Sequence, residues 1–395
     1  MKDKRILYVS SEVVPYLPET EIASTAFNVA KKAHSKGVQT RIFMPRFGVI
    51  NERRHQLHEV IRLSGMNLII NDMDMPLIIK VASIPKERMQ VYFIDNDELI
   101  YSLRSIAKNC AWVNHIYIVT DAQRPEWLEK ECSNVTIIDH KEIFECEEHL
   151  PTYNSMAIEW NITNIKDLSE HFIYLNDDMF FGKALSDSYF FDAEKRARLF
   201  CVKKRSTENE LLDKSLIQKD NPYQHAIVNS RQAVYDKTGY LANSHPAHGA
   251  YVFNKSTLLE LKEVYSELVE QTVSSRFRTN KNVFIYALYS FHQQSCGVSV
   301  TSIKRLKKEP WMYRLLPKFN SDDYYLYAGL DVRRKRLTRY YKLIELFSPS
   351  MYCINDCADA TPSRREEMRL FLEKMYPEKS PYEKCTSLQA GLNRE

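Results

Sequence analysis

Apolar stretches alternate with amphipathic and polar segments along the chain. Residues 5–9 form a short apolar run, residues 22–36 place apolar side chains on one face of a helix, and residues 38–44 are apolar again. Gly37 stands between the last two segments and ends the helix. This order predicts a β-α-β unit with a right-handed crossover. Further strands are predicted at residues 66–70, 77–82 and 90–94.

The alternation continues after residue 96. A helix follows, and apolar strands are predicted at residues 112–121, 135–139 and 172–175. The first of these strands ends in a Thr-Asp pair. Polar groups therefore gather at the C-terminal ends of strands, where ligands bind in open α/β sheets. Near the end of the chain, Thr361 is predicted to cap a helix that begins at Pro362 and ends before Pro377.

Composition narrows the class of protein. The 395 residues suffice for two domains, and 44% hydrophobic residues with 24 Tyr and 18 Phe indicate a globular chain. A P-loop and a G-x-G-x-x-G motif are both absent, which argues against P-loop kinases and dehydrogenases. Neither a membrane-spanning run nor a signal peptide is recognisable, so a cytoplasmic protein is predicted.

The cysteines are expected to be reduced thiols. All eight are scattered without a C-x-x-C pair. Cys353 and Cys357 are the closest two, and no histidine lies near them in the sequence to complete a zinc site.

Positive charge is concentrated in two places although the net charge is only +4. Residues 304–308 form one basic cluster, and residues 333–336 with Arg339 and Lys342 form another. Two interpretations stay open: a solvated surface, or a landing zone for an anionic polymer, a sugar nucleotide or a lipid headgroup. The second would allow peripheral contact with the inner face of a membrane. Nucleic acid is not expected, because no binding motif accompanies the charge. Residues 302–342 are predicted to form a helical or irregular arm.

The segment HFIYLNDDMFFGK carries the clearest chemistry. An apolar strand runs directly into Asn176, Asp177 and Asp178. Two carboxylates and an amide at the end of a strand suit Mg²⁺ or Mn²⁺, which prefer oxygen ligands. A turn is the alternative explanation of the same residues.

Two resemblances to known families follow from longer stretches. The runs ILYVSSEVVPYLPE and MPRFGVINERRHQLHEVIRL resemble the N-terminal edge of bacterial glycogen (starch) synthases, over about residues 4–97. That family has a Lys-x-Gly-Gly loop after its first strand, whereas residues 18–23 here read PETEIA. Without glycine the backbone does not easily approach a pyrophosphate. This part is therefore expected to keep the fold of that family without its catalytic loop.

Residues 96–384 resemble the Stealth family of sugar-phosphate transferases, which includes bacterial capsule polymerases and the lysosomal-enzyme N-acetylglucosamine-1-phosphotransferase. The matching runs include NDELIYSLRSI, WVNHIYIVTDAQRPEWL, LSEHFIYLNDDMFFGK, SHPAHGAYVFNKSTL and SRFRTNKNVFIYALY. The resemblance implies an α/β fold, with a nucleotide-sugar-transferase-like (Rossmann-like) core and helical insertions, preceded by a small β-α-β half-domain. The expected organisation is a glycogen-synthase-like segment over 1–97, a Stealth-type phosphotransferase domain over 98–384 and a tail over 385–395.

The Stealth resemblance also implies a reaction. A hexose-1-phosphate would pass from a UDP-sugar to a hydroxyl of a polysaccharide or oligosaccharide, forming a phosphodiester of a capsular or cell-surface polymer. Asp177 and Asp178, with Asp356 as a further carboxylate, would hold Mg²⁺ or Mn²⁺. His248 is the preferred general base on the acceptor hydroxyl and His245 the second choice, since imidazole titrates near neutrality.

Three further residues are substrate-binding candidates. Arg276 and Arg278 alternate around a phenylalanine, so in an extended segment both would face one side and grip a phosphate. Asn176 would orient the site. Glu159 has two open interpretations, a buried or capping role and a part in catalysis.

One departure from the family pattern bears on activity. Stealth proteins usually begin with a conserved region of the type Asp-x-Val-x-Thr-Trp-Val-Asp, and nothing of that kind stands upstream of residue 96. Asp95 ends an apolar strand and is a hypothetical replacement for the aspartate of that region. Two alternatives therefore stand beside the phosphotransferase: a glycosyltransferase of glycogen-synthase type, and a catalytically impaired fusion that binds anionic polysaccharide.

Overall fold

A computed structural model of the chain describes most of its residues. These are residues 5–9, 13–16, 20–36, 38–45, 58–59, 66–70, 73–84, 89–95, 98–121, 123–125, 127–203, 211–217, 221–306, 324–330, 334–355 and 362–384.

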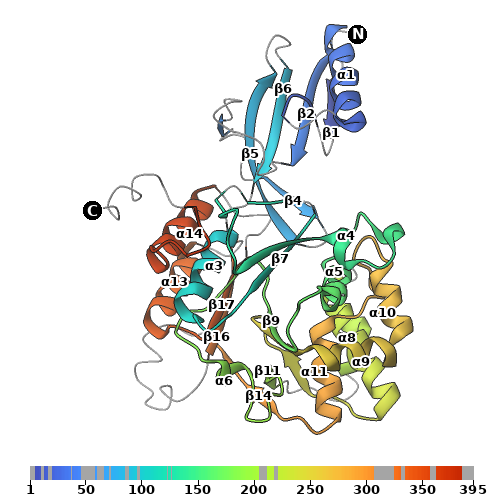
Figure 1. Cartoon of the computed structure of the whole chain (residues 1–395), viewed down its shortest axis with the longest axis vertical. Helices are drawn as coiled ribbons and strands as arrows, with labels where there is room; N and C mark the ends of the chain where they lie inside the picture. The colour runs from blue at the N-terminus through green and yellow to red at the C-terminus, as the bar shows by residue number, and fades with distance from the viewer. Residues whose placement is uncertain are drawn as a thin grey trace.

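The N-terminal strands form one six-stranded sheet, at the top of Figure 1. Its elements are β1 (Arg5–Val9), α1 (Glu21–Ser35), β2 (Gln39–Pro45), β3 (His58–Glu59), β4 (Met66–Ile70), β5 (Met73–Ile84) and β6 (Met89–Asp95). The β1 and β2 strands are parallel and joined through α1, which confirms the predicted β-α-β order. Thr20 caps α1 by accepting a hydrogen bond from the backbone N of Ala23 at 3.0 Å. The strands predicted at 66–70, 77–82 and 90–94 lie in β4, β5 and β6.

The remainder is a mixed α/β body whose described strands form four smaller sheets. The strands are β7 (Ile116–Thr120), β8 (Val135–Asp139), β9 (His171–Tyr174), β10 (Met179–Phe180), β11 (Leu199–Lys203), β12 (Ser244–Pro246), β13 (Tyr251–Asn254), β14 (Val300–Ser302), β15 (Lys304–Arg305), β16 (Tyr324–Gly329) and β17 (Met351–Asn355). They pair in the orders β10-β17-β16-β15, β12-β11-β14, β13-β9 and β7-β8.

Helices cover these strands on both sides in Figure 1. On one side lie α3 (Glu98–Asn109), α13 (Arg334–Phe347) and α14 (Pro362–Met375). On the other lie α4 (His140–Ile143), α5 (Ser155–Asn161), α8 (Pro222–Thr238), α9 (Lys255–Val264), α10 (Ser266–Val273) and α11 (Ile285–Ser295). A short α6 (Asp187–Phe190) precedes β11.

Beside a small cluster around Ile143 and Ala157, two large hydrophobic cores fill the described part of the body. The larger includes Trp160, Leu199, Val252 and Tyr286, on the side of α5 and α11. The smaller packs α13 and α14 against β16 and β17 and contains Leu326, Leu343, Tyr352 and Tyr376. Within it the Tyr352 and Tyr376 hydroxyls are 2.6 Å apart, so these two buried polar groups satisfy each other.

The predicted strand boundaries in this body are confirmed to within a few residues, with one shortening. The predicted strand 135–139 is β8, and 172–175 overlaps β9. The predicted strand 112–121 begins only at Ile116. Residues before it form a turn, with Val113 N donating to Cys110 O at 3.0 Å and the Trp112 indole donating to Leu185 O at 2.6 Å.

The predicted helical or irregular arm over 302–342 is only partly correct for the described part of that segment, because α13 is helical but the segment packs into the body. Strand β16 lies inside a sheet, parallel to β17, and β15 pairs beside it. Helix α13 buries Leu337, Leu343 and Ile344 in the smaller core. The Tyr324–Gly329 run is apolar enough to fill a buried strand, and the neighbouring basic residues concealed that signal. Residues 307–323 and 331–333, which hold part of both basic clusters, lie outside the described residues.

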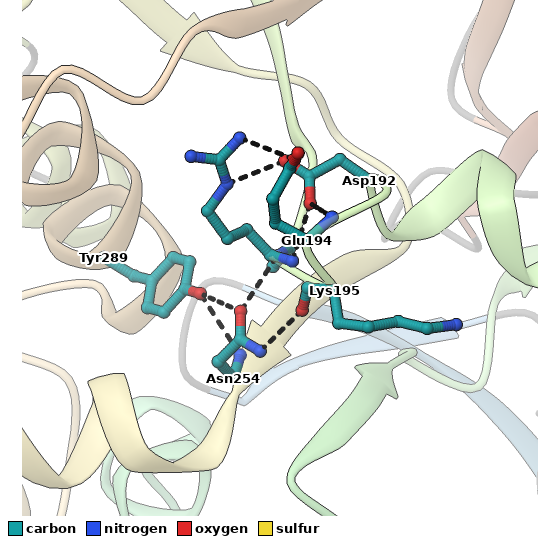
Figure 2. Close-up of polar contacts among 7 residues, drawn as sticks. Asp192, Glu194, Lys195, Asn254 and Tyr289 are labelled. Carbon is teal, nitrogen blue, oxygen red and sulfur yellow. Dashed lines mark hydrogen bonds and ion pairs between the residues drawn. The ribbon is translucent and has the colours of Figure 1, made fainter.

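Asn254 anchors the end of β13 to the turn that precedes β11 (Figure 2). Its amide oxygen accepts from the backbone N of Ala197 at 2.8 Å, and its Nδ2 donates to Lys195 O at 3.1 Å. The Tyr289 hydroxyl lies 3.3 Å from the same amide oxygen. Lys195 has a positive φ of 61°, so the turn is tight, and Asp192 closes it by accepting from Arg196 N at 2.8 Å. This support holds β13 in place beside β9, the strand that leads to Asp177.

Candidate active site

The Asn-Asp-Asp segment joins β9 to β10 and is held at both ends. Strand β9 pairs with β13, where Tyr174 lies opposite Tyr251. After a turn closed by Met179 N and Asn176 O at 3.2 Å, β10 pairs with β17. The backbone O of Asp178 accepts a hydrogen bond from Ile354 N at 3.2 Å. The carboxylates are thereby fixed against the C-terminal half of the chain.

This pairing brings together three side chains from distant parts of the sequence, here called the Asp178 cluster: Asp178, His248 and Cys353. A carboxylate oxygen, a ring nitrogen and the Cys353 Sγ all lie within 4.8 Å of one another. The thiol donates to Asp178 Oδ2 at 3.0 Å. Register explains the meeting, since Met179 on β10 is directly opposite Cys353 on β17.

Burial controls the protonation of Asp178, just before β10, and of Cys353 on β17. Asp178 is 8% exposed, and this burial raises the pKa of its carboxyl to about 7, with the charge of Asp177 adding to the shift. Hydrogen bonds from the Cys353 thiol and the Asn355 side chain partly offset it. Burial and the neighbouring Asp178 raise the pKa of Cys353 well above its ordinary value, so the thiol is protonated at neutral pH. Asp177, in contrast, is exposed.

His248 reaches the cluster from the loop after β12. Its ring stands edge-on to Tyr327 of β16, with the ring centroids 5.0 Å apart and an interplanar angle of 87°. Burial lowers the pKa of His248 to about 4, and the charges of Arg305 and His245 add to the effect. The imidazole is therefore neutral at pH 7. The next residue, Gly249, allows this loop to approach β17, because a Cβ there would lie 2.2 Å from the Sδ of Met351.

Arg305 supplies a positive charge beside His248. Its guanidinium lies 5.4 Å from the centroid of the Tyr327 ring, and its Nη2 donates to Tyr327 O at 3.3 Å. It sits on β15, opposite Tyr325 of β16. The sheet thus places a cation next to the Asp178 cluster.

A second buried group, here called the Glu159 cluster, consists of Glu159, Arg278, Ser155 and Tyr174. Glu159 and Ser155 lie on α5, and Arg278 donates from Nη2 to the Ser155 hydroxyl. The Tyr174 hydroxyl donates to Glu159 Oε1 at 3.5 Å. Burial raises the pKa of Glu159 to about 7 against the opposing effect of Arg278. This carboxyl is therefore partly protonated near neutral pH.

Tyr174 lies between Glu159 and the Asn-Asp-Asp segment. Its pKa lies well above the ordinary value because of burial, and the charges of both Glu159 and Asp177 contribute. Its ring is stacked on Tyr251, with centroids 6.2 Å apart and planes 3° from parallel. Tyr251 is in turn hydrogen-bonded to Tyr223. A wall of tyrosines therefore runs beside the carboxylates, as is common where a planar base or a sugar binds.

Several buried polar atoms of these clusters make no hydrogen bond within the described part of the chain. They are Asp178 Oδ1, His248 Nε2, Glu159 Oε2 and Arg278 Nε. Buried polar atoms normally have partners, so four such atoms in these two clusters indicate binding sites.

The structure places the remaining sequence candidates as follows. His245 is half-buried near His248, with its Nδ1 2.9 Å from Pro246 O. Asn176 closes the turn before β10 through its backbone O. Arg276 is exposed, and the chain bends at Arg276 and Phe277 instead of running extended, so the two arginines do not form the predicted row. Asp356 lies outside the described residues.

The sequence did not indicate Cys353 or Tyr327 as residues of the site, and it indicated Arg305 only as part of a charged run. Cys353 stands two residues before Asn355, within the part of the chain, residues 96–384, that resembles the Stealth family. That proximity was the available signal. Its contact with Asp178, 175 residues away, depends on strand register that the sequence does not reveal.

Some of the donor atoms at this site suit a divalent cation such as Mg²⁺, and others suit a softer ion. Asp178 offers a buried carboxylate oxygen that makes no hydrogen bond in the described part of the chain, and the exposed Asp177 is its neighbour. Oxygen ligands of this kind suit Mg²⁺ or Mn²⁺. The imidazole and the thiol of the same cluster suit softer ions.

Comparison with known proteins gives three matches to family models. Residues 92–199 match the model described as Stealth protein CR2, conserved region 2, and residues 247–293 match Stealth protein CR3, conserved region 3. Residues 5–111 match the model described as starch synthase catalytic domain. These matches confirm both resemblances inferred from the sequence.

Curated relatives are similar over most of the chain. The capsular polysaccharide phosphotransferase LcbA of Neisseria meningitidis is 34% identical over 274 residues, which are 67% of this chain and 67% of the relative. An exopolysaccharide phosphotransferase of Streptomyces coelicolor is 32% identical over 297 residues, 74% of this chain and 46% of the relative. The capsular polysaccharide phosphotransferase fcs1 of Haemophilus influenzae is 38% identical over 208 residues, 50% of this chain and 55% of the relative.

The chain spans half or less of the length of the Streptomyces relatives, at 46%, 29% and 50%.

None of the described helices combines the length and the apolar character needed to cross a membrane.

Proposed function

The chain belongs to the Stealth family, and from this premise we propose that it transfers a hexose-1-phosphate from a UDP-sugar to a hydroxyl of a polysaccharide or oligosaccharide. The acceptor oxygen would bond to the phosphorus that carries the sugar, and the bond from that phosphorus to the bridging oxygen would break. UMP would leave and a phosphodiester would remain in a capsular or cell-surface polymer. Relatives named as capsular and exopolysaccharide phosphotransferases support this reaction.

The Asp178 cluster is the observation that carries the proposal. It sets a neutral imidazole, a carboxylate and a nearby guanidinium around one point, with Asp178 Oδ1 and His248 Nε2 making no hydrogen bond in the described structure. Phosphoryl transfer needs such parts: a proton acceptor, charge neutralisation and alignment.

His248 is the proposed general base. Its lowered pKa makes the ring neutral at pH 7, so Nε2 is able to accept the proton of the acceptor hydroxyl. An anionic diphosphate nearby would raise that pKa toward neutrality and make the imidazole a stronger base. His245 is the second candidate, being half-buried and close to His248.

Asp177 and Asp178 are proposed to hold Mg²⁺ or Mn²⁺, with Asp356 as a predicted further ligand. When bound, such an ion would neutralise charge on the diphosphate. The Asn355 side chain, hydrogen-bonded to Asp178, would orient that carboxylate.

Two arginines are proposed to contact the phosphates, Arg278 of the Glu159 cluster and Arg305 beside the Asp178 cluster. Arg278 is oriented by Ser155, and Arg305 by Tyr327. Arg305 takes the place given to Arg276 in the sequence prediction, because Arg276 is exposed on a bend. Guanidinium groups fixed by packing suit phosphate oxygens.

A Rossmann-like core that binds the nucleotide sugar is part of the proposal. Parallel pairs β7-β8 and β15-β16-β17 support it, as do polar residues at the ends of strands.

Peripheral contact with a membrane and a cytoplasmic location stay predictions. Helix α13 exposes Lys335, Arg336 and Lys342. These side chains form a basic surface that suits the anionic headgroups of a membrane.

A glycogen-synthase-type glycosyltransferase is the second candidate, favoured by the match of residues 5–111 to the starch synthase catalytic domain. It would move the sugar without its phosphate and release a nucleoside diphosphate. Both clusters lie outside the part that is unique to this match, which favours the phosphotransferase.

The test is chromatographic analysis of the nucleotide product. Purified protein would be incubated with Mg²⁺, a panel of UDP-sugars including UDP-N-acetylglucosamine, and a capsule-type oligosaccharide. UMP that depends on the acceptor supports the proposal. UDP would identify ordinary glycosyl transfer, and a folded protein that releases no nucleotide from any donor would count against both transferases.

A further inference from the structure

We propose that the Asp178 cluster is a three-ligand site for Zn²⁺, with Asp178, His248 and Cys353 as the protein ligands. The inference goes beyond the proposed transfer reaction, because it concerns which ion these residues select. It rests on the geometry of the cluster and on the chemistry of its donor atoms.

The donor set matches zinc better than magnesium. Carboxylate oxygen, imidazole nitrogen and thiolate sulfur are the three ligand types that zinc takes, whereas Mg²⁺ prefers oxygen and water. Zinc–ligand bonds of about 2.0–2.3 Å in a tetrahedron separate the ligand atoms by roughly 3.3–3.8 Å. The atoms here lie within 4.8 Å of one another, so small side-chain rotations suffice.

Burial supplies the second, independent observation. Asp178 is more than nine-tenths buried, yet its Oδ1 makes no hydrogen bond within the described residues, and the same is true of His248 Nε2. An ion between these atoms would satisfy both. Three protein ligands leave a fourth position for water or substrate.

Binding requires one proton to leave. The Cys353 thiol now donates to Asp178 Oδ2, and Zn²⁺ would replace that proton, which passes to solvent. Tyr327 and Arg305 pack beside the cluster and Met351 lies under the His248 loop, so the ligands are held by a rigid surround.

A consequence follows if the proposed function is right. Zn²⁺ on His248 would occupy the nitrogen that is to accept the acceptor proton, so zinc would inhibit a reaction that magnesium supports. This inhibition by zinc rests on the proposed function, whereas the zinc-binding site does not.

The binding test uses the full chain, stripped of metal with a chelator and titrated with Zn²⁺ against a chromophoric competitor. One tight site per chain is expected. Cys353→Ser should weaken it by more than about tenfold, since losing even an outer-shell partner costs that much. The matched control is Cys296→Ser, which removes an exposed thiol and should change nothing. An equal loss in both variants, or no tight site in the wild-type chain, would overturn the proposal.

Cobalt gives a readout that does not depend on a variant folding. Co²⁺ in this site should show a thiolate-to-metal absorption and the intense visible bands of a tetrahedral ion. Co²⁺ bound without the thiolate band would exclude Cys353 as a ligand. Zinc binding through Cys353, together with no UMP from any donor when the zinc-free protein is assayed in Mg²⁺, would leave the site standing and reject the transferase, whereas UMP release without zinc binding would reject the site alone.

Discussion

At the scale of single residues, the site depends on two buried carboxyl groups whose ordinary behaviour has been altered. Burial raises the pKa of both Asp178 and Glu159 to about 7. Ionising a buried carboxyl group costs free energy, so these residues lower the stability of the folded protein at neutral pH. A role in binding or catalysis explains their presence better than a role in stability does.

Asp178→Asn should abolish transfer without unfolding the protein. Asparagine keeps the shape of the side chain and an acceptor oxygen for the Cys353 thiol, but it loses the charge that neutralises a cation. UMP release should fall about a hundredfold or more. Circular dichroism and the midpoint of thermal unfolding should stay near the wild-type values. Full activity in this variant would remove Asp178 from the mechanism.

Glu159→Gln should change how stability depends on pH. The folded-state pKa of Glu159, about 7, lies above its ordinary value of 4.5. The buried neutral carboxyl is therefore tolerated below pH 4.5, and stability is lost as the pH rises through 7. Glutamine does not ionise, so the variant should be more stable than wild type at pH 8 by roughly 2–3 kcal/mol and similar to it at pH 5.

The measurement is urea unfolding of both proteins at several pH values between 5 and 8. Glu263→Gln serves as a matched control, because Glu263 is exposed on α9 and its variant should follow the wild-type curve. Parallel curves for wild type and Glu159→Gln would show that Arg278 and Tyr174 keep Glu159 ionised throughout.

At this scale the sequence predicted residue types better than contacts. Asp177, Asp178 and His248 stood in recognisable runs, and the structure brings Asp178 and His248 together. The sequence could not predict the position of Cys353, because this residue joins them only through the pairing of β10 with β17. The Arg276 prediction assumed an extended segment, and a bend removes that geometry.

At the scale of elements, α3 is tied to the C-terminal segment by a buried ion pair. Arg104 donates from Nε and Nη2 to the two carboxylate oxygens of Glu383 at 2.8 and 2.7 Å, and from Nη1 to Tyr376 O at 3.1 Å. The side chains are only 11% and 3% exposed. This bidentate pair keeps the residues after α14 folded against α3.

Glu383→Ala should destabilise the protein by about 2–4 kcal/mol, since it leaves a buried guanidinium without its carboxylate. Denaturant unfolding would measure the loss. Glu366→Ala is the matched control: Glu366 pairs with Arg369 on the surface of α14, where an ion pair is worth about 0–1 kcal/mol. Equal effects of the two substitutions would show that the Arg104 pair is not part of the core.

The spacing of apolar residues predicted helices and strands well where no run of charged residues interrupted the pattern. Helix α14 begins at Pro362 as expected, and α1 spans Glu21–Ser35 against a predicted 22–36. Strand β16 was missed because charged residues surround it and the pattern there suggests a surface. Burial of such a strand is decided by the sheet that receives it, which local pattern does not describe.

At the scale of the whole molecule, the described strands of residues 5–95 pair only with one another, and the strands after them form separate sheets. The two family resemblances predict a boundary at residue 97, whereas composition and periodicity alone predict only an α/β chain with room for two domains.

A chain that begins at residue 96 should therefore fold by itself. The two large hydrophobic cores, as far as the described residues show them, contain nothing before Leu99, and both clusters of the candidate site come from residues after it. We expect a single cooperative unfolding transition within a few degrees of the full-length value, and retained zinc binding. Aggregation would show that the N-terminal sheet covers apolar surface of the body. UMP release then decides the role of Asp95: activity in the shortened chain would exclude it as the replacement aspartate, and inactivity with intact zinc binding would support it.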